Sequence, residues 1–173
     1  FSFEAKTDYP VAEDNCSYII DSTFTPVESI GFLGATSTTE LNGFTINVVP
    51  DPSILGMWQY SKPYAAGDYS ALSFATCETF PDELVAIREV GGNLAMLGSQ
   101  SLEIWGIGSK ENIPFEFIKQ SSKNIGCVSR ENACVIDESL FFIGKNRSGE
   151  VSAYILKDME LVEVGTPDMV AIW

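Results

Sequence analysis

The sequence contains no histidine and few basic residues. Ten lysines and arginines stand against 24 aspartates and glutamates, which gives a formal net charge of −14 and a pI near 4.2. A protein that binds nucleic acid by neutralising its phosphates needs an excess of basic over acidic residues, so the composition argues against that class. No apolar run approaches the roughly 20 residues that a membrane-spanning helix requires, and we therefore expect no association with a membrane.

The four cysteines, Cys16, Cys77, Cys127 and Cys134, show no CxxC spacing. Because histidine is missing as well, a structural zinc site has no evident ligand set, and we predict neither a metal nor another cofactor. A chain of this size buries enough apolar surface to fold without cross-links, so we predict free, partly buried thiols. Disulfides in a secreted protein are the alternative.

Without histidine, acid–base catalysis would depend on carboxylates such as Asp82, Glu83 and Glu103, which a propeller glycosidase could use as a pair. No spacing marks any two of them as partners. Residues 106–110 (GIGSK) lack the spacing of a phosphate-binding loop and precede no helical pattern, which is typical of a turn. We therefore predict no catalytic, cofactor or metal site residues and no enzyme.

Tryptophan is the other residue type that could form a site, since its ring stacks on sugars. In an alternating strand, however, tryptophan more often belongs to a core or an interface. The chain contains Trp58, Trp105 and Trp173.

The pattern of the chain is organised around residues 90–127. Two alternating apolar segments, a tight turn and a proline-led third segment follow one another there, which predicts one antiparallel sheet. Leu94 and Met96 and, across the turn, Leu102 and Ile104 are predicted to place one face of these strands on a core. The side chains predicted to be largely buried in this module are Leu94, Met96, Ile104, Trp105, Phe115 and Phe117.

The remaining segments carry mostly strand signals. Asn42-Gly43 is the strongest hairpin signal in the chain, and it precedes the β-rich residues 44–49. An edge strand is expected near the N-terminus, a turn at residues 62–68, and either strand or a helical turn at residues 69–84. Further strands are predicted at residues 17–21, 30–33, 54–61, 84–90, 93–99, 133–146, 151–157 and 159–164.

Apolar hairpin openings at Phe44, Leu94 and Leu140 recur about every 46 to 50 residues, which is close to the spacing of blades in some propellers. A propeller usually needs four or more blades to close, and the chain has material for about three or four. We therefore predict an all-β fold of antiparallel, β-propeller-like blades, as a partial propeller or a fragment of one. The alternative is an unrelated antiparallel β protein, because such spacings also arise there.

The predicted organisation has two parts. Residues 1–68 form an N-terminal β segment with blade-like hairpins, and residues 69–173 form the blade repeats. The opening at Phe1 and the apolar ending VAIW predict that these parts belong to one domain of a longer chain.

Four blocks within residues 69–164 carry a resemblance to a known family. They read ALSFATCETFPDELVAI, LAMLGSQSLEIWGIG, PFEFIKQSSKNIGC and SLFFIGKNRSGEVSAYIL. Their order and spacing resemble the packaged-DNA stabilization family, the tail-hub (nozzle) proteins of short-tailed bacteriophages (podoviruses). The matching positions are Ala71, Leu72, Phe74, Ala75, Glu78, Pro81, Asp82, Val85, Leu97, Gly98, Glu103, Trp105, Pro114, Phe115, Gly126, Cys127, Leu140, Ile143, Gly144, Gly149 and Tyr154.

The resemblance implies a virion structural protein without an active site. A subunit of this kind forms a homohexameric tube that closes the head-to-tail channel, stabilises the packaged DNA and supports tail fibres, a tailspike or a needle during genome delivery. The partners it implies are further copies of the chain, the portal or head-to-tail adaptor proteins, and DNA that passes without specific binding. It also implies assembly in the bacterial host cytoplasm and a final location in the virion tail.

One loop departs from the family pattern. After Gly126 and Cys127 the family often has a small-residue turn and a proline, whereas this chain has Val-Ser-Arg-Glu at residues 128–131, so this loop is expected to differ. Two other functions stay open: a carbohydrate- or protein-binding propeller of a bacterial cell surface, and a propeller glycosidase.

Overall fold

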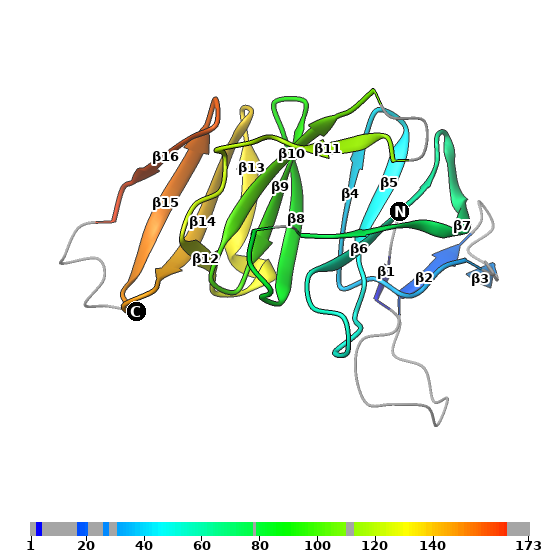
Figure 1. Ribbon diagram of the computed structural model, residues 1–173, viewed down its shortest axis with the longest axis horizontal. Coiled ribbons are helices and arrows are strands. Elements are labelled where there is room, and N and C mark those ends of the chain that lie inside the picture. Colours follow the sequence, from blue (N-terminus) through cyan, green and yellow to red (C-terminus); the bar gives the residue numbers. More distant parts are fainter. Residues whose placement is uncertain are drawn as a thin grey trace.

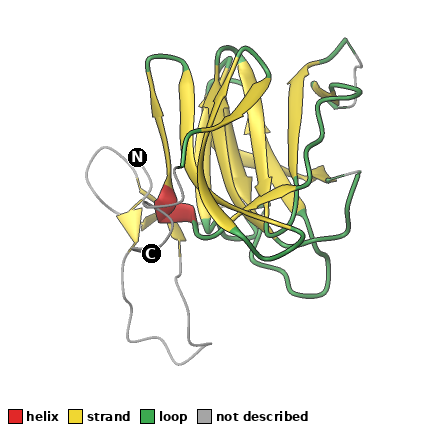
Figure 2. Cartoon of the chain, turned by 90° about the vertical axis from the view of Figure 1, so that its left-hand side faces the viewer, coloured by secondary structure: helices red, strands yellow, loops and turns green. Residues whose placement is uncertain are grey.

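The computed structural model describes residues 3–4, 17–20, 26–27, 31–77, 79–109 and 113–165. Strands dominate these ranges (Figure 1), and Figure 2 shows a single short helical turn, η1 (Arg130–Asn132), among them. Within the same ranges, no helix is long and apolar enough to span a membrane. The prediction of an all-β fold is therefore confirmed.

Three antiparallel meanders follow one another along the chain, and we call them blades 1, 2 and 3. Blade 1 contains β4 (Ser37–Leu41), β5 (Phe44–Val48), β6 (Met57–Lys62) and β7 (Ala65–Thr76). Blade 2 contains β8 (Leu84–Val90), β9 (Asn93–Gly98), β10 (Leu102–Ile107) and β11 (Phe115–Phe117). Blade 3 contains β12 (Ile125–Cys127), β13 (Ala133–Ile136), β14 (Ser139–Asn146), β15 (Val151–Lys157) and β16 (Glu160–Glu163). β12 and β13 pair with the two ends of β14, so together they take the place of the first strand and β14 is the second.

The blades are arranged as in part of a propeller. β8 lies against β4 on one side and β13 on the other, so the first strands of the three blades are neighbours, and the blades stand side by side in Figure 1. The residues that mark the predicted repeat, Phe44, Leu94 and Leu140, each lie at the start of the second strand of a blade. The prediction of a partial β-propeller is confirmed.

A small separate sheet contains the N-terminal strands β1 (Phe3–Glu4), β2 (Ser17–Ile20) and β3 (Pro26–Val27). β1 lies at the edge of this sheet, as predicted, and β2 matches the strand predicted at residues 17–21. The other residues of the predicted N-terminal segment up to residue 30 lie outside the described residues.

Two apolar cores lie at the junctions between blades. The first, between blades 1 and 2, includes Ile46, Trp58, Leu94 and Phe115. The second, between blades 2 and 3, includes Leu97, Ile104, Leu140, Phe142 and Leu156. Blade 2 is thus covered on both faces, as a sheet within a stack of sheets must be.

The prediction that Leu94, Met96, Leu102 and Ile104 share one face is wrong. The register pairs Leu102 with Leu97 and Ile104 with Ala95, so Leu102 and Ile104 belong to the core with blade 3. Leu94 and Met96 point the other way, into the core with blade 1. Both faces are apolar because both are buried, and the sequence pattern then does not distinguish them.

Five of the six side chains predicted to be buried in this module are buried, the most exposed being Trp105 at 3%. The exception is Phe117, which is half-buried and packs at the edge of the first core. Its strand, β11, is the outermost strand of blade 2, and an edge strand has a neighbour on one side.

The segment predicted as a strand at residues 30–33 is not one. Ile30 lies outside the described residues, and Gly31 starts an irregular stretch whose backbone passes close to Tyr69. The backbone N–H of Leu33 donates to Oε1 of Gln59 at 3.2 Å, and Nε2 of Gln59 donates to the carbonyl of Gly34 at 3.2 Å. The side-chain amide of Gln59 thus forms the hydrogen bonds that a neighbouring strand would otherwise provide. The alternation of residues in the sequence does not reveal such a contact.

In the second half of blade 1 the structure corrects one prediction and decides another that the sequence left open. The turn predicted at residues 62–68 is much tighter, because β6 ends at Lys62 and β7 begins at Ala65. Residues 69–84, left open between helix and strand, continue β7 as far as Thr76. β7 therefore runs across the proposed boundary between residues 68 and 69, and that boundary stays a prediction.

Blades 1 and 3 have different outward faces. In blade 1 the face carries buried polar groups, and Nδ2 of Asn47 donates to the hydroxyl of Tyr69 at 2.7 Å. In blade 3 it carries the half-buried Phe141 and Ile155 in register with the 54% exposed Val162. An apolar sheet face of this kind is what the next blade covers in a propeller.

Candidate functional site

The predicted carboxylate Asp82 fixes a turn. It lies just before β8, is only 9% exposed, and accepts hydrogen bonds from the backbone N–H of Gln100 at 2.7 Å and the hydroxyl of Ser101 at 2.9 Å. Both donors belong to the turn between β9 and β10. A Cβ on Gly98 would overlap the Asp82 carboxylate, so glycine is required beside it. Asp82 therefore caps a turn within blade 2.

The second candidate, Glu103 on β10, is 1% exposed. Its Oε1 accepts a hydrogen bond from the backbone N–H of Thr79 at 2.5 Å, and its Oε2 accepts one from Nε1 of Trp105 at 3.0 Å. Glu103 thereby ties the connection between blades 1 and 2 to the middle of blade 2. The third candidate, Glu83, is exposed. The structure does not set these carboxylates up as a general acid and base in an open cleft.

A cysteine lies close to the two buried carboxylates. Burial raises the pKa of the Cys77 thiol well above its usual value of 9.0, and the charges of Glu103 and Asp82 raise it further. Burial also raises the pKa of Cys127, against smaller opposing effects of hydrogen bonding by the Ser129 backbone and of the charge of Arg88. In the structure its Sγ donates to the carbonyl of Ser129 at 3.0 Å, which stabilises the neutral thiol. Neither thiol is activated as a nucleophile, because activation requires a lowered pKa.

We expect all four cysteines to be reduced in the native protein. Cys77, Cys127 and Cys134 are free thiols in the structure, and Cys16 lies outside the described residues. Alkylation after unfolding without a reductant should therefore label four sites, as read by intact mass spectrometry. A mass showing any intramolecular disulfide would contradict this expectation and would indicate a secreted protein.

The tryptophans lie in the first core rather than on a surface. The rings of Trp58 and Trp105 meet edge to face with 5.3 Å between centroids, and the ring of Phe115 lies 5.6 Å from that of Trp58. All three side chains are at most 3% exposed, so they are not placed to stack on a sugar. Trp173 lies outside the described residues.

Glycine 126, another position of the resemblance, shows how two blades approach each other. A Cβ on Gly126 would overlap the backbone of Ser99 and Gln100, in the turn that Asp82 caps. Blade 3 therefore starts in direct backbone contact with blade 2. Gly126 thus allows the second junction to close.

Most other positions of the resemblance are also structural. Leu97, Phe115, Leu140 and Tyr154 lie in the two cores. Exceptions include Leu72 and Phe74 on β7, which are 82% and 40% exposed. Glu78 lies outside the described residues. The resemblance is thus carried mainly by residues that build blades and their junctions.

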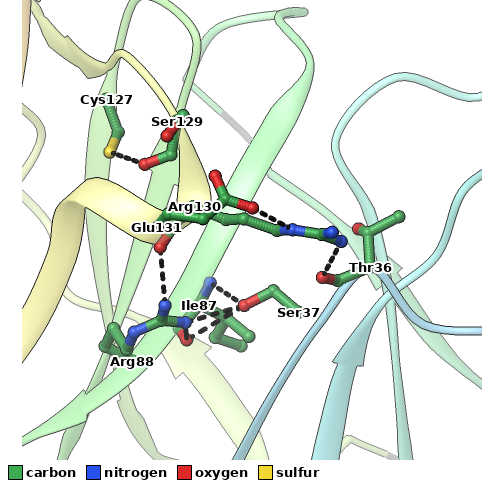
Figure 3. Close-up of polar contacts among 8 residues, drawn as sticks. All are labelled: Thr36, Ser37, Ile87, Arg88, Cys127, Ser129, Arg130 and Glu131. Atoms are coloured by element: carbon green, nitrogen blue, oxygen red, sulfur yellow. Dashed lines mark hydrogen bonds and ion pairs between the residues drawn. The ribbon is translucent and has the colours of Figure 1, made fainter. Parts of the chain in front are cut away.

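Arg88 is a residue that the sequence analysis missed. Its guanidinium donates hydrogen bonds to Oγ of Ser37 and the carbonyls of Ile87 and Arg130, each at 2.8 Å (Figure 3). A fourth hydrogen bond runs to the carbonyl of Ala133 at 3.1 Å. These acceptors belong to blade 1, blade 2, and the start of blade 3. Burial lowers the pKa of Arg88 below its usual value, although arginine stays charged in proteins. The sequence signal that could have identified Arg88 is a lone arginine within the mainly apolar strand LVAIREV.

Arg130 extends this connection through the loop that departs from the family pattern. Its Nη1 donates to the carbonyl of Thr36 at 2.8 Å, and its Nε lies 2.7 Å from Oε1 of Glu131 (Figure 3). The hydrogen bond from Arg130 is the main reason that the pKa of Glu131 is lowered to about 2. The departing loop thus contacts the residue that precedes β4 of blade 1. That it differs from the same loop in the family stays a prediction.

Taken together, these residues hold three blades in register and offer little reactive chemistry. Within the described ranges, no group of three or more His, Cys, Asp or Glu side chains is arranged to hold a metal ion. The arrangement provides a rigid scaffold. Asp82 and Glu103 hold a turn of blade 2 and the connection that leads into it, and Arg88 and Arg130 join the first strands of neighbouring blades.

Comparison with protein families gives a match to the family described as bacteriophage P22 Gp10, β-propeller. The match covers residues 66–172, which is more than half of the chain and includes β7 except for its first residue, all of blade 2 and all of blade 3. Among curated proteins, none matches the chain. The extent of the family match, on a fold that the family description names, shows that this chain belongs to the phage-stabilising β-propeller family of bacteriophage P22 Gp10.

Proposed function

We propose that the chain is a subunit of the tail hub, or nozzle, of a short-tailed bacteriophage. In this role six copies form a ring below the portal or its adaptor, close the head-to-tail channel and stabilise the packaged DNA. The ring also supports the tail fibres, tailspike or needle during genome delivery. Assembly takes place in the cytoplasm of the bacterial host, and the mature protein is part of the virion.

The family match over residues 66–172 is the observation that carries this proposal. Two features of the structure support a structural role within it. The buried carboxylates Asp82 and Glu103 are both occupied in holding backbone and side chains. The first strands of the blades are tied together by Arg88, as suits a protein that must transmit load without changing shape.

Electron microscopy of the full-length chain tests the proposal directly. The expected result is a closed ring with six-fold symmetry at micromolar concentration or on binding to the head-to-tail adaptor. A protein that stays monomeric under both conditions would contradict the hub assignment. Size-exclusion chromatography with light scattering provides an independent measure of the same mass.

The two other functions lack a specific observation in their favour. A sugar-binding propeller would be favoured by aromatic side chains gathered on one rim, whereas Trp58, Trp105 and Phe115 lie in a core. A glycosidase would be favoured by two carboxylates in a common pocket, whereas Asp82 and Glu103 each bind neighbouring protein groups. We therefore propose a non-enzymatic protein.

We predict that the isolated protein does not bind duplex DNA measurably near physiological salt. The net charge of −14 repels phosphates, and in a ring the fields of repeated subunits add over a Debye length of about 8 Å. A lumen richer in Asp and Glu than in Lys and Arg would let DNA slide during delivery. The alternative is that the acidic residues only keep the outer surface soluble.

Fluorescence anisotropy with a labelled duplex at about 0.15 M salt is the appropriate measurement, since salt dependence reports phosphate contacts. No change in anisotropy is expected up to high protein concentration. A micromolar dissociation constant that weakens with salt, or a basic lumen in the assembled ring, would overturn the prediction.

A further inference from the structure

A cavity of about 220 Å³ lies between blades 2 and 3. Its apolar lining comes from Val90, Ala95 and Ile104 of blade 2 and Leu156 of blade 3. Its rim is formed by the turn between β8 and β9, the turn between β13 and β14, and the turn between β15 and β16. These three hairpin turns lie at the same, upper end of the blades in Figure 1.

The equivalent place between blades 1 and 2 is filled by large side chains. Phe44 is the first residue after the two-residue turn of its hairpin, and its ring contacts those of Tyr60 and Phe115 with centroid distances of 6.2 and 5.3 Å. Ile46 pairs with Tyr60 on the same face. Aromatic side chains therefore fill the first junction near its hairpin turns, where the second junction contains the cavity.

Register identifies the residues that make the difference. Asn93 follows its turn as Phe44 does, Ala95 occupies the position of Ile46, and Ile104, its cross-strand partner, occupies that of Tyr60. The equivalent positions thus carry a smaller or non-aromatic side chain in blade 2 in all three cases.

The rim of the cavity is predominantly acidic. Glu138, Lys157 and Asp158 belong to its lining, and two further acids lie beside them, Asp137 in the turn with Glu138 and Glu160 at the start of β16. Met159, which is 46% exposed, adds a flexible apolar side chain beside them. A group that enters the cavity therefore meets an apolar floor and a rim with excess negative charge.

We propose that this cavity is a docking site for a partner protein that inserts one aromatic side chain from a basic loop. The ring would contact Val90, Ala95, Ile104 and Leu156, in the manner of Phe44 at the first junction. Basic residues on either side of the ring would face Glu138 and Asp158. This inference concerns a surface of the single chain and does not depend on the virion role proposed above.

The two parts of the proposed contact have different roles. Transfer of the ring from water to the apolar floor provides the affinity. The acidic rim selects basic over acidic loops and increases the rate of encounter, because exposed charge pairs contribute mainly to specificity. A short peptide that carries one such ring is expected to bind weakly, since the ordering of its flexible chain opposes binding.

The test uses three peptide probes and NMR of protein labelled at Ala, Ile, Leu and Val methyl groups. Acetyl-Lys-Phe-Lys-amide at up to about 10 mM should shift the methyl signals of Val90, Ala95, Ile104 and Leu156 in a saturable manner, as weak binding requires. Acetyl-Glu-Phe-Glu-amide should bind at least about threefold more weakly because of the acidic rim. Acetyl-Lys-Gly-Lys-amide should not shift these signals.

Two variants at one position provide the matched comparison. Asn93→Phe places a ring where blade 1 has Phe44 and should abolish the methyl shifts, whereas Asn93→Ala leaves the cavity open and should retain them. Unchanged signals from the first core would show that both variants fold. The proposal is overturned if the cavity methyls do not respond to the lysine peptide, if Asn93→Phe binds like the parent protein, or if the glutamate peptide binds as tightly.

Discussion

Replacing Phe115 with alanine is expected to lower the free energy of unfolding by about 3 to 5 kcal/mol, the range for truncating a buried phenylalanine. The Phe115 side chain is 2% exposed, and its ring lies 5.3 to 5.6 Å from those of Phe44, Trp58 and Tyr60. These neighbours belong to blade 1, so the cavity would open at the junction between two blades. Rigid sheets on both sides limit how far it could collapse.

Urea unfolding followed by tryptophan fluorescence measures this effect, because Trp58 lies beside the deleted ring and Trp105 contacts Trp58. Leu72→Ala serves as the control, since Leu72 is 82% exposed and its truncation should change stability by less than about 0.5 kcal/mol. A loss below about 1 kcal/mol for Phe115→Ala would contradict the description of this junction as a packed core.

Arg88→Met is expected to cost about 3 kcal/mol or more, because it removes four hydrogen bonds from a charged donor, and such bonds contribute about 1.5 to 3 kcal/mol each. The acceptors are Oγ of Ser37 and the carbonyls of Ile87, Arg130 and Ala133. Methionine retains most of the apolar stem of arginine, so the loss reports mainly on the hydrogen bonds. Arg88→Lys should recover only part of it, since an ammonium cannot reproduce the planar fork.

The control for Arg88 is Lys62→Met. Lys62 forms an ion pair with Asp68 at 2.7 Å, but the two side chains are 58% and 52% exposed, and such pairs contribute at most about 1 kcal/mol. Hydrogen exchange adds a local measurement, because the amide of Ile87 donates to Oγ of Ser37 and should exchange faster in Arg88→Met. Protection at Ile87 equal to that of the parent protein would mean that Arg88 does not hold the first strands together.

The sequence by itself determined most of the strands and their turns. Alternation of apolar residues marks a strand wherever one face is buried, and Asn42-Gly43 adopts the positive φ values of 50° and 81° that its hairpin requires. The repeat of Phe44, Leu94 and Leu140 predicted the blades, because each blade needs the same apolar second strand. The family resemblance in residues 69–164 overlaps the residues that the family match covers.

Only the tertiary structure decided which face of blade 2 contacts which neighbour. Leu94 and Ala95 are both apolar because both faces are covered, so the period of two that predicts the strand does not identify the partner. Two further predictions depended on non-local contacts in the same way. Leu33 and Gly34 form hydrogen bonds with the side chain of Gln59 on β6 instead of with a strand, and Phe117 is half-buried because β11 is an edge strand.

The site depended on tertiary structure even more strongly. From the sequence alone, Asp82 and Glu103 are candidates for catalytic carboxylates. Only their hydrogen bonds to Gln100, Ser101 and Thr79 show that they stabilise a turn and a connection between blades. Arg88 was missed because its acceptors lie up to 51 residues away in the chain. A hydrogen bond between distant backbone segments leaves no periodic trace in a sequence, whereas burial of a strand face does.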